Sequence, residues 1–447
     1  MSDLLDLATK VAGWARPGEQ VEAYASRQAE TEVKAYDGEV ESLSSAVSAG
    51  LGVRVVAGGR QGFAYAGSLD EDVLAETLEE ARDNAAFAGA EAWVGLPEPD
   101  GARPLALELW DEELAGYRTE AKVEAALDLE RLARAHDARI KQVESSVWGD
   151  VSSEMALASS LGVSATDRST ACYLSVAAVA GQGDETRVGS GYTVGRRPSQ
   201  LVPEKAADDA VTRAVRLLGA VKPRSAHLTV VFEPRVSAQL LGLLGSVLSG
   251  EAVLKGVSLF ADRLGEQVAS RSFTLVDDPT NEVAWGASAV DDEGLACRPV
   301  TLVEQGMLKG FLYDTTSARR AGARSTASAV RAGYKSAPGV GARAVCLAPG
   351  SLSPGEVLAQ VGDGLLVQSL SGLHSGVNAV SGDFSVGAEG LLIRGGALAG
   401  PVREMTIASS IQRMLQGVCA IGNDLEWLPS RAAGLTLAIS VMSMSGA

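Results

Sequence analysis

Apolar and polar side chains alternate in a series of short segments near the start of the chain. A period of two places successive side chains on opposite faces, which is the pattern of a β-strand. The alternating segments are residues 21–25, 32–36, 40–46, 52–56 and 62–66. Gly58-Gly59-Arg60 falls between the last two and supplies the positive-φ residues that a tight hairpin needs. The chain is therefore predicted to begin with a sheet.

Helical patterns flank these strands. Residues 3–15 have the spacing of a short amphipathic helix. Ser68 precedes Glu71 by three residues, the spacing of a capping box, and the apolar positions that follow share one helical face. These positions are Leu74, Leu78, Ala81 and Ala85. Further helices are expected at residues 112–136 and 198–218, with two or three long β-segments between them at 140–194. The first half is predicted to be a sheet backed by helices.

The length of the chain, 447 residues, is about three times that of a typical single domain, so two domains with separate cores are expected. The segment VKPRSAHLTVVFEP, in which prolines bracket a strand-like run, is the best boundary candidate. Beyond it, glycine and short apolar alternations dominate, which is typical of an antiparallel sheet or barrel. We expect an α+β fold, with a sheet-and-helix domain at residues 1–222 and a mostly antiparallel, β-rich, barrel-like domain at residues 223–447.

Charge and apolar content exclude several classes of protein. Hydrophobic residues make up 46% of the chain, and the formal net charge is -17. Such a charge repels phosphate backbones, so nucleic acid is not an expected partner. No apolar run reaches the roughly 18 to 20 residues of a membrane helix, and the first residues do not read as a signal peptide. Four scattered cysteines suit reduced structural thiols. We expect a cytoplasmic protein with no membrane contact.

Six blocks in the second half carry a resemblance to a known family. In chain order they are GEQVAS (265–270), LVDDP (275–279), AVDDEG (289–294), GMLKGFLYD (306–314), LSGLHSGVNAVSGDFSVGAEGLLIRGGALAGPVREMTIA (370–408) and IGNDLEW (421–427). With these blocks the chain resembles the TldD/PmbA metallopeptidase family, also described as the modulator of DNA gyrase family. The resemblance spans nearly the whole chain and implies a peptidase that acts on short or unfolded peptides.

Members of the TldD type carry an HExxxH segment on a helix before the GEQVAS-like block, and its histidines and a later cysteine resemble a zinc-ligand set. An ungapped count places this segment on residues 241–246, where its functional positions are Leu241, Gly242 and Ser246. Leucine has no lone pair for a metal, a serine hydroxyl is a poor zinc ligand, and Gly242 replaces the base. Cys419 precedes IGNDLEW and no cysteine follows it. The helix instead has an apolar stripe, formed by Leu240, Leu241, Leu244, Val247 and Leu248.

This pattern resembles the TldE type, which lacks the metal site and accompanies a TldD-type chain. The resemblance implies no metal, no cofactor and no catalytic residue in this chain, with zinc held by a TldD-like partner.

The segment after residue 370 holds the candidate peptide-binding residues, because polar side chains stand there among glycines whose backbone can approach a ligand closely. They are His374, Ser375, Asn378, Ser381 and Asp383, with Phe384 as an apolar contact. The TldE resemblance favours a loop that contacts peptide, and a structural turn network is the alternative. A Ser–His–Asp nucleophile is disfavoured, since adjacent residues on a strand point to opposite faces.

Two other clusters have competing interpretations. The carboxylates Asp277-Asp278 and those of residues 291–293 are oxygen ligands that suit a hard cation such as calcium, although turn residues or surface acids are the better interpretation. Arg319-Arg320 and Arg324 form a basic cluster. It is either an exposed mobile segment or a flexible flap that engages a peptide carboxylate or an acidic partner.

The sequence favours one function and leaves two alternatives open. The expected function is the metal-free, TldE-type subunit of a heterodimeric zinc metallopeptidase, in which a TldD-like partner supplies zinc and chemistry. The first alternative is a non-catalytic, peptide-binding homodimer. The second is an independent hydrolase that uses His374 or Ser375.

Overall fold

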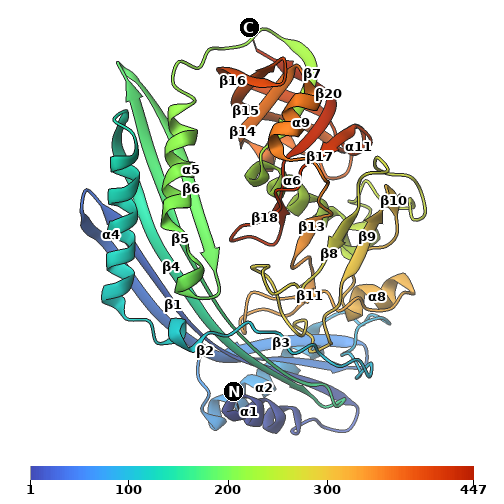
Figure 1. Ribbon diagram of the computed structural model, residues 1–447. Helices are drawn as coiled ribbons and strands as arrows, with labels where there is room; N and C mark the ends of the chain where they lie inside the picture. The colour runs from blue at the N-terminus through green and yellow to red at the C-terminus, as the bar shows by residue number, and fades with distance from the viewer. Residues whose placement is uncertain (1, 447) are drawn as a thin grey trace.

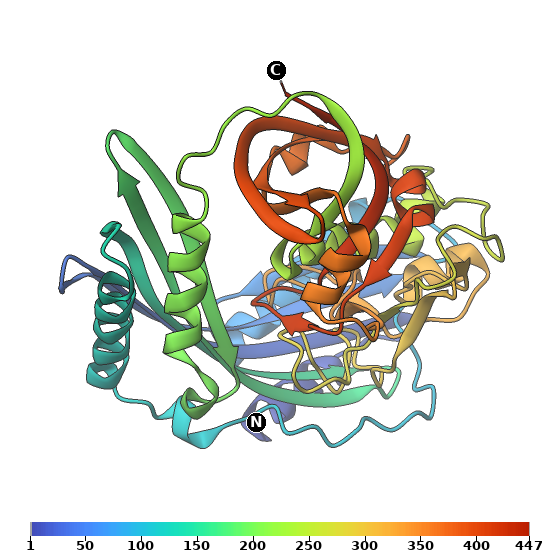
Figure 2. The ribbon, with the colours of Figure 1, turned by 45° about the horizontal axis from the view of Figure 1, so that its top comes forward.

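The computed structural model describes residues 2–446 of the chain. A long curved N-terminal sheet holds a β-rich C-terminal half on its concave side (Figure 1). In the turned view of Figure 2, strands of the C-terminal half form a ring that faces the viewer. The mixed α+β class predicted from the sequence is confirmed.

The N-terminal sheet has the strand order β3-β2-β1-β4-β5-β6, and all its neighbouring pairs are antiparallel. Its strands are β1 (Glu19–Tyr36), β2 (Glu39–Ala57), β3 (Arg60–Ala66), β4 (Ile140–Ser159), β5 (Ser164–Gln182) and β6 (Glu185–Gly195). The segments predicted at 21–25 and 32–36 are thus two parts of one strand. The polar residues between them do not break β1, because Ser26 to Thr31 pair with both β2 and β4.

Two-residue turns join the first three strands. Asp37 (φ 54) and Gly38 (φ 82) connect β1 to β2, and Gly58 (φ 56) and Gly59 (φ 74) connect β2 to β3. The predicted glycine hairpin is confirmed, with Arg60 as the first residue of β3 and not part of the turn. A β-bulge follows the first turn: Val40 pairs with Ala35 and Ser42 with Lys34, so residue 41 has no partner in β1.

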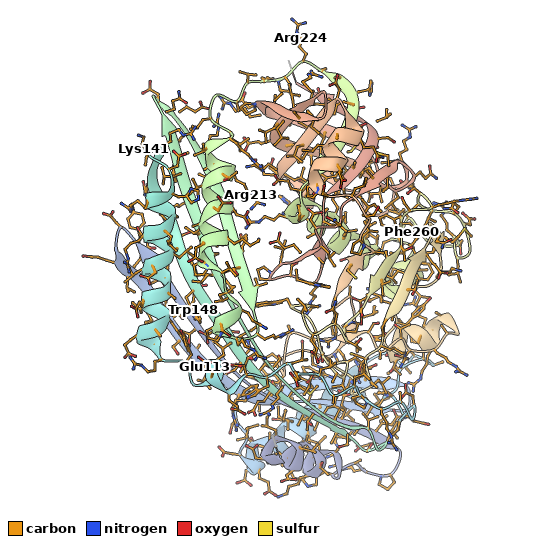
Figure 3. All side chains as sticks on the ribbon, in the orientation of Figure 1. Glu113, Lys141, Trp148, Arg213, Arg224 and Phe260 are labelled. Carbon is orange, nitrogen blue, oxygen red and sulfur yellow. The ribbon has the colours of Figure 1, made fainter. Side chains whose placement is uncertain are left out.

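Helices cover one face of this sheet at both of its ends. They are α1 (Ser2–Ala12), α2 (Glu71–Phe87), α3 (Glu112–Ala115), α4 (Thr119–His136) and α5 (Pro203–Val215), with a 3-10 turn at Pro198–Gln200. Val21 and Ala23 of β1 are buried in one apolar cluster with α1 and α2, and Val33 in another with α4. Trp148 of β4, labelled in Figure 3, belongs to the second cluster. Odd-numbered residues of β1 therefore face helices.

Details of the predicted helices differ from the structure. The buried face predicted for α2, at Leu74, Leu78, Ala81 and Ala85, is confirmed. The predicted capping box is wrong, because Asp70 is the N-cap residue of α2 and the Ser68 hydroxyl donates to the Asp70 carboxylate (2.9 Å). The helix expected at 112–136 is two helices, α3 and α4, because Gly116 ends the first.

The C-terminal half contains a closed barrel, which confirms the barrel-like fold expected there. Its strands are β7 (Ala226–Phe232), β14 (Gly364–Ser371), β15 (Asp383–Arg394), β16 (Ala397–Ser410) and β20 (Leu437–Ser445). Pairing of β16 with β20 closes the ring, β7 and β14 are parallel, and the other pairs are antiparallel. The expected division near residue 222 falls between α5 and β7, and it stays a prediction.

Short elements surround the barrel. The strands are β8 (Leu275–Asp277), β9 (Val300–Glu304), β10 (Met307–Leu308), β11 (Ala329–Val330), β12 (Gly339–Val340), β13 (Val345–Leu347), β17 (Val418–Ile421), β18 (Glu426–Trp427) and β19 (Ala433–Gly434). The helices are α6 (Pro234–Val247), α7 (Gly250–Leu254), α8 (Thr315–Ala321), α9 (Pro354–Val361), α10 (Leu373–Gly376) and α11 (Ile411–Gln416). Within residues 2–446, no helix has the length and apolar character that crossing a membrane requires.

A buried ionic network joins the two halves. Arg54 of β2 places its Nη2 2.5 Å from Glu22 Oε2 and 3.0 Å from Glu293 Oε1. Arg331 Nη2 lies 2.9 Å from Glu22 Oε1, and its guanidinium stacks over the Tyr24 ring. Burial by itself would raise the pKa of Glu22, but the two guanidinium groups outweigh it and hold that pKa below its usual value. Glu22 and Arg54 thus remain charged inside the protein.

The acidic run at residues 291–293 belongs to this network. Asp291 and Glu293 are fully buried. Glu293 accepts from Arg54 and from the Thr315 backbone N–H (2.9 Å), and Asp291 accepts from the Leu295 (2.9 Å) and Ala329 (3.1 Å) backbone N–H groups. The interpretation as surface acids is therefore wrong for this pair. The calcium alternative fails for Asp291 and Glu293 as well, because arginine and backbone donors already use these oxygens.

Replacing Arg54 with alanine should destabilise the protein by about 3–5 kcal/mol, because the Glu22 and Glu293 carboxylates would lose a buried counter-charge. Urea denaturation of the wild type and of Arg54→Ala measures the difference. Arg16→Ala is the matched control, since Arg16 and Glu79 form an exposed ion pair (57% and 55% side-chain exposure) whose loss should cost at most about 1 kcal/mol. Equal losses in both variants would show that the network does not hold the halves together.

Candidate functional site

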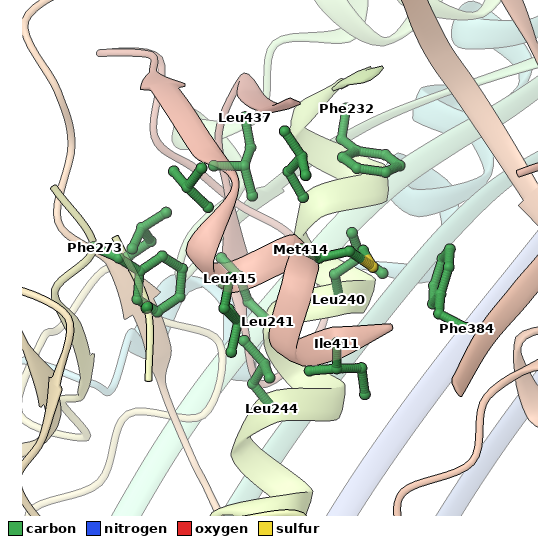
Figure 4. Close-up of a cluster of buried hydrophobic side chains, with 14 of the residues drawn as sticks. Phe232, Leu240, Leu241, Leu244, Phe273, Phe384, Ile411, Met414, Leu415 and Leu437 are labelled. Carbon is green, nitrogen blue, oxygen red and sulfur yellow. The ribbon is translucent and has the colours of Figure 1, made fainter. Parts of the chain in front are cut away.

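Helix α6 carries the positions that the sequence aligned with a metal site. Pro234 occupies its first turn, where the missing N–H is not needed. One side of the helix is buried in the barrel core, where Leu240, Leu241 and Leu244 are 7%, 1% and 5% exposed. Figure 4 shows these leucines among apolar side chains of other elements. Their neighbours include Phe273, Phe384, Ile411, Met414 and Leu415. The predicted apolar stripe is confirmed.

The three aligned positions contribute no set of metal ligands. Leu241 lies in the apolar core, and Gly242 has no side chain. Ser246 is exposed, and its hydroxyl donates to the carbonyl oxygen of Gly242 (3.3 Å). Across residues 2–446, no group of three His, Cys, Asp or Glu side chains is arranged to hold a metal ion. The donor chemistry of this helix therefore does not fit zinc.

The opposite side of α6 faces a pocket of about 480 Å³ between the N-terminal sheet and the C-terminal half. Gly242 lies on its wall, together with Arg235 and Gln239 from the same helix. Strand β6 and helix α5 form another wall through Val188, Ser190, Tyr192, Arg213 and Leu217. The remaining wall consists of residues 368–370, Glu389 and the segment 428–432. The pocket is thus assembled from both halves.

Polar contacts beside the pocket tie α5 to the C-terminal half. Glu233, the N-cap residue of α6, accepts from Arg213 (Nε to Oε2, 3.3 Å) and from Arg216. The Gln368 amide donates to the Arg213 carbonyl (2.9 Å). Figure 3 labels Arg213 on the side of α5 that faces the barrel. These contacts keep the two walls of the pocket at a fixed separation.

Arg235 lies between β6 and α6. Its Nη1 donates to the Ser190 carbonyl (2.5 Å) and hydroxyl (2.9 Å), and its guanidinium lies 4.1 Å from the centre of the Tyr192 ring. It forms no ion pair with a carboxylate in residues 2–446. Burial, together with the nearby positive charge of Arg213, lowers the pKa of Arg235 to about 10. The environment of Arg235 thus penalises its positive charge.

The candidate peptide-binding residues form a turn at one end of the barrel. Asn378 Oδ1 accepts from the backbone N–H groups of Val380 (2.9 Å) and Ser381 (3.1 Å). The Ser381 hydroxyl donates to Asp383 Oδ2 (2.6 Å). These contacts match the turn-network alternative. His374, Ser375, Asn378, Ser381 and Asp383 are exposed, and none of them lines the pocket at α6.

Two expectations for this region require correction. Phe384 is 1% exposed and packs in the barrel core, so it is not available to contact a peptide. His374 and Ser375 lie on the short helix α10 rather than on a strand, and within residues 2–446 neither makes a side-chain hydrogen bond to the other or to Asp383. The Ser375 hydroxyl instead donates to the Gly372 carbonyl (3.3 Å).

The basic cluster near residue 320 is largely a docked helix. Arg319 and Arg320 belong to α8. Arg319 donates to the Leu96 carbonyl (2.7 Å), and the Arg320 guanidinium lies 5.3 Å from the centre of the Trp93 ring. Both contacts reach the segment after α2. The flexible-flap interpretation therefore fails for these two arginines, whose side chains are held by the N-terminal half.

Sequence reasoning missed the arginines of the α6 pocket. Arg213, Arg235 and Arg431 come from three distant segments that meet only in the folded chain. The available signal was local: Arg235, Gln239 and Gly242 have helical spacing and fall opposite the leucine stripe of α6. That spacing indicates an exposed face but does not reveal what lies across from it.

Comparisons with known proteins give consistent matches along the chain. Sequence profiles described as PmbA/TldA metallopeptidase domain 1, central domain and C-terminal domain match residues 21–85, 112–218 and 225–446. Metalloprotease PmbA of Escherichia coli O157:H7 is 28% identical over 393 residues, which cover 87% of this chain and 84% of that protein. A metalloprotease TldD homolog of Haemophilus influenzae is 27% identical over 404 residues, covering 87% and 82%.

Solved structures show the same fold. A putative modulator of DNA gyrase from Bacteroides thetaiotaomicron superposes with a TM-score of 0.87 at 26% identity and covers 99% of this chain and 98% of that one. TldE from Thermococcus kodakarensis superposes with a TM-score of 0.89 at 24% identity, covering 100% of each chain.

The space beside Gly242 leads to a stability prediction. A Cβ at residue 242 would meet only the Ala432 Cβ, at 3.7 Å, so Gly242→Ala should stabilise α6 by about 0.5–1 kcal/mol through helix propensity. Gly245→Ala is the control on the same helix. Its Cβ would lie 2.9 Å from Val345 Cγ2 and 3.1 Å from Ala342 Cβ, so it should destabilise by about 1–3 kcal/mol. Urea denaturation measures both, and destabilisation by Gly242→Ala would contradict an open site.

Proposed function

This chain belongs to the PmbA/TldD metallopeptidase family, and we propose that it is a metal-free, TldE-type subunit of a two-chain peptidase. One observation carries the proposal: Leu241, Gly242 and Ser246 offer an apolar group, no side chain and an exposed hydroxyl where a zinc enzyme needs ligands and a base. A TldD-like partner would then hold the zinc and perform the hydrolysis.

The proposed substrate is a short or unfolded peptide held in the cleft between the two halves. Strand β6 lies at the edge of the N-terminal sheet and lines the pocket at α6. An extended peptide beside such an edge is bound mainly through its backbone, which favours binding with little sequence selectivity. The polar turn at residues 374–383 is a second surface proposed to contact peptide, without Phe384.

The exposed half of β2 supports the proposal of a partner chain. Residues 39–48 are exposed, and β3 pairs only with residues 51–57 of β2. Val40, Leu43 and Val47 present 41%, 46% and 73% of their surface to solvent. A strand edge that combines free backbone groups with apolar side chains is a ready surface for pairing with another chain. We assign it to the TldD-like partner.

The proposal includes a cytoplasmic location, which the four unpaired cysteines support because thiols stay reduced in that compartment. The peptide-binding homodimer and the independent hydrolase remain as outcomes of the experiments below. No contact in residues 2–446 favours the hydrolase, since the Ser375 hydroxyl is hydrogen-bonded to a backbone carbonyl rather than to His374.

The purified chain should contain no stoichiometric zinc and should leave an unfolded peptide intact, whereas adding a TldD-like partner should produce cleavage that a chelator abolishes. Elemental analysis and mass spectrometry of the peptide provide the readouts. About one tightly bound zinc per chain would end the proposal. Chelator-resistant cleavage by this chain, lost in Ser375→Ala, would support the hydrolase instead. Peptide binding by a homodimer that stays inactive with every TldD-like partner would support the non-catalytic alternative.

Two substitutions separate the roles of residues in the 374–383 turn. Asn378→Ala should lower the melting temperature, because it removes an acceptor for two backbone N–H groups, each such bond contributing about 0.5–1.5 kcal/mol. His374→Ala should leave the melting temperature unchanged, because within residues 2–446 the imidazole has no hydrogen bond or ion pair to lose. If the turn contacts peptide, His374→Ala should slow turnover by the two-chain enzyme. Normal turnover in this variant would remove His374 from the peptide site.

A further inference from the structure

We propose that the pocket beside Gly242 binds the C-terminal carboxylate of a peptide, with Arg235 as its main cation. This inference rests on the proposed function, because it takes the ligand to be a peptide held by this chain. It specifies which group of the peptide binds in the cleft and which residue binds that group. The pocket combines positive charge, free hydrogen-bond donors and an apolar wall.

The pocket has an excess of positive charge in an acidic protein. The chain has a formal net charge of -17, yet the charged side chains that line this pocket are Arg213, Arg235, Arg431 and a single carboxylate, Glu389. Arg213 is already paired with Glu233. Arg431 is exposed and forms no ion pair in the described part of the chain. Two of the three arginines therefore form no ion pair with a carboxylate within residues 2–446.

Arg235 has the free donors that a carboxylate needs. Within residues 2–446, its hydrogen bonds all leave from Nη1 and go to neutral acceptors of Ser190. Neither Nε nor Nη2 has a hydrogen-bond partner in residues 2–446, and neither is fully buried, so both donors keep contact with solvent in a residue that lines the pocket. Nε–H and Nη2–H point the same way and match the two oxygens of a carboxylate. A bound anion would also relieve the penalty that burial and Arg213 impose on this charge.

An apolar wall beside the arginines favours a terminal residue over a small inorganic anion. Val188, Leu217, Val236, Leu370, Leu428 and Pro429 line the same pocket. The volume of about 480 Å³ exceeds the space that one carboxylate occupies. A peptide end would place its carboxylate on Arg235 and its last side chain on this wall. Phosphate would use the cations and leave the apolar wall empty.

The pocket occupies the side of α6 on which the aligned glutamate position, Gly242, lies. The nearest charges on that side are cationic and suit an anion, whereas a metal ion would be repelled. The pocket therefore has the opposite ligand preference from a metal site. In the two-chain enzyme, capture of the peptide end here would position the rest of the peptide for the partner chain.

The test uses the purified chain without partner or zinc. The probe is a fluorescein-labelled decapeptide of uncharged residues that ends in leucine, as the free acid and as the C-terminal amide, followed by fluorescence anisotropy. The free acid should bind at least about tenfold more tightly, the ratio expected when a charge-assisted hydrogen bond is lost. Arg235→Gln should reduce this preference to near unity, and Arg235→Lys should restore only part of it, because lysine keeps the charge without the paired donors.

Two further variants keep the test independent of folding. Arg431→Gln changes an exposed pocket residue with no ion pair in residues 2–446, so it should weaken binding of the free acid while the melting temperature stays constant. Arg224→Gln is the control, since Arg224, labelled at the top of Figure 3, is exposed and does not line the pocket. It should leave the preference intact.

Competition identifies the ligand group. Acetyl-leucine should displace the free-acid peptide, and acetyl-leucinamide should not. Displacement by inorganic phosphate but not by acetyl-leucine would overturn the carboxylate assignment. Equal binding of acid and amide, absence of binding by either peptide, or an unchanged preference in a folded Arg235→Gln variant would overturn the inference. Any of these results alongside chelator-sensitive cleavage by the two-chain enzyme would refute the pocket assignment while leaving the proposed function standing.

Discussion

The buried pairing of Arg54 with Glu22 and Glu293 fixes how the two halves of this protein meet. A charge inside a protein is tolerated only when opposite charges and hydrogen bonds replace the lost water. Arg54 meets this condition by taking one carboxylate from its own sheet and one from the C-terminal half. Separation of the halves would leave Glu293 without Arg54 and Arg331 without Glu22, so the interface has one strongly preferred geometry. The cleft between the two halves lies farther along the same sheet, so its shape depends on this contact.

Helix α6 has different chemistry on its two faces at the positions that the sequence aligned with a metal site. Leu241 is part of the barrel core, where an imidazole would need a polar partner that the apolar cluster does not supply. Gly242 leaves the wall of the pocket open, and Arg235 and Arg213 bring positive charge to it. The same helix therefore stabilises the barrel with one face and presents an anion-attracting surface with the other.

The sequence predicts the fold class and the leucine stripe because both depend on local periodicity, which survives in any environment. Strand lengths were underestimated, because Ser26 to Thr31 look like a break until their two neighbouring strands are known. The burial of Glu293 was missed for the same reason, since its arginine partner Arg54 is more than two hundred residues away. Phe384 looked accessible in a glycine-rich segment, but alternation within β15 turns it into the barrel. The arginine pocket unites distant segments and has no sequence signature of its own.

The β-bulge at Glu41 divides β2 into a part that tolerates the insertion or deletion of a residue and a part that does not. Glu41 has no backbone pairing partner in β1, and the pairs on either side of it are complete, so a chain without this residue would keep Glu22 opposite Arg54. Loss of a residue between Ser42 and Arg54 would not be tolerated in the same way, because the side chains of β2 after that point would change face. The Arg54 guanidinium would then point toward the helices. Insertions and deletions in this hairpin should therefore be tolerated better at its tip than between Ser42 and Arg54. The ionic network therefore constrains the number of residues between Ser42 and Arg54 as firmly as it constrains the types of the residues that form it.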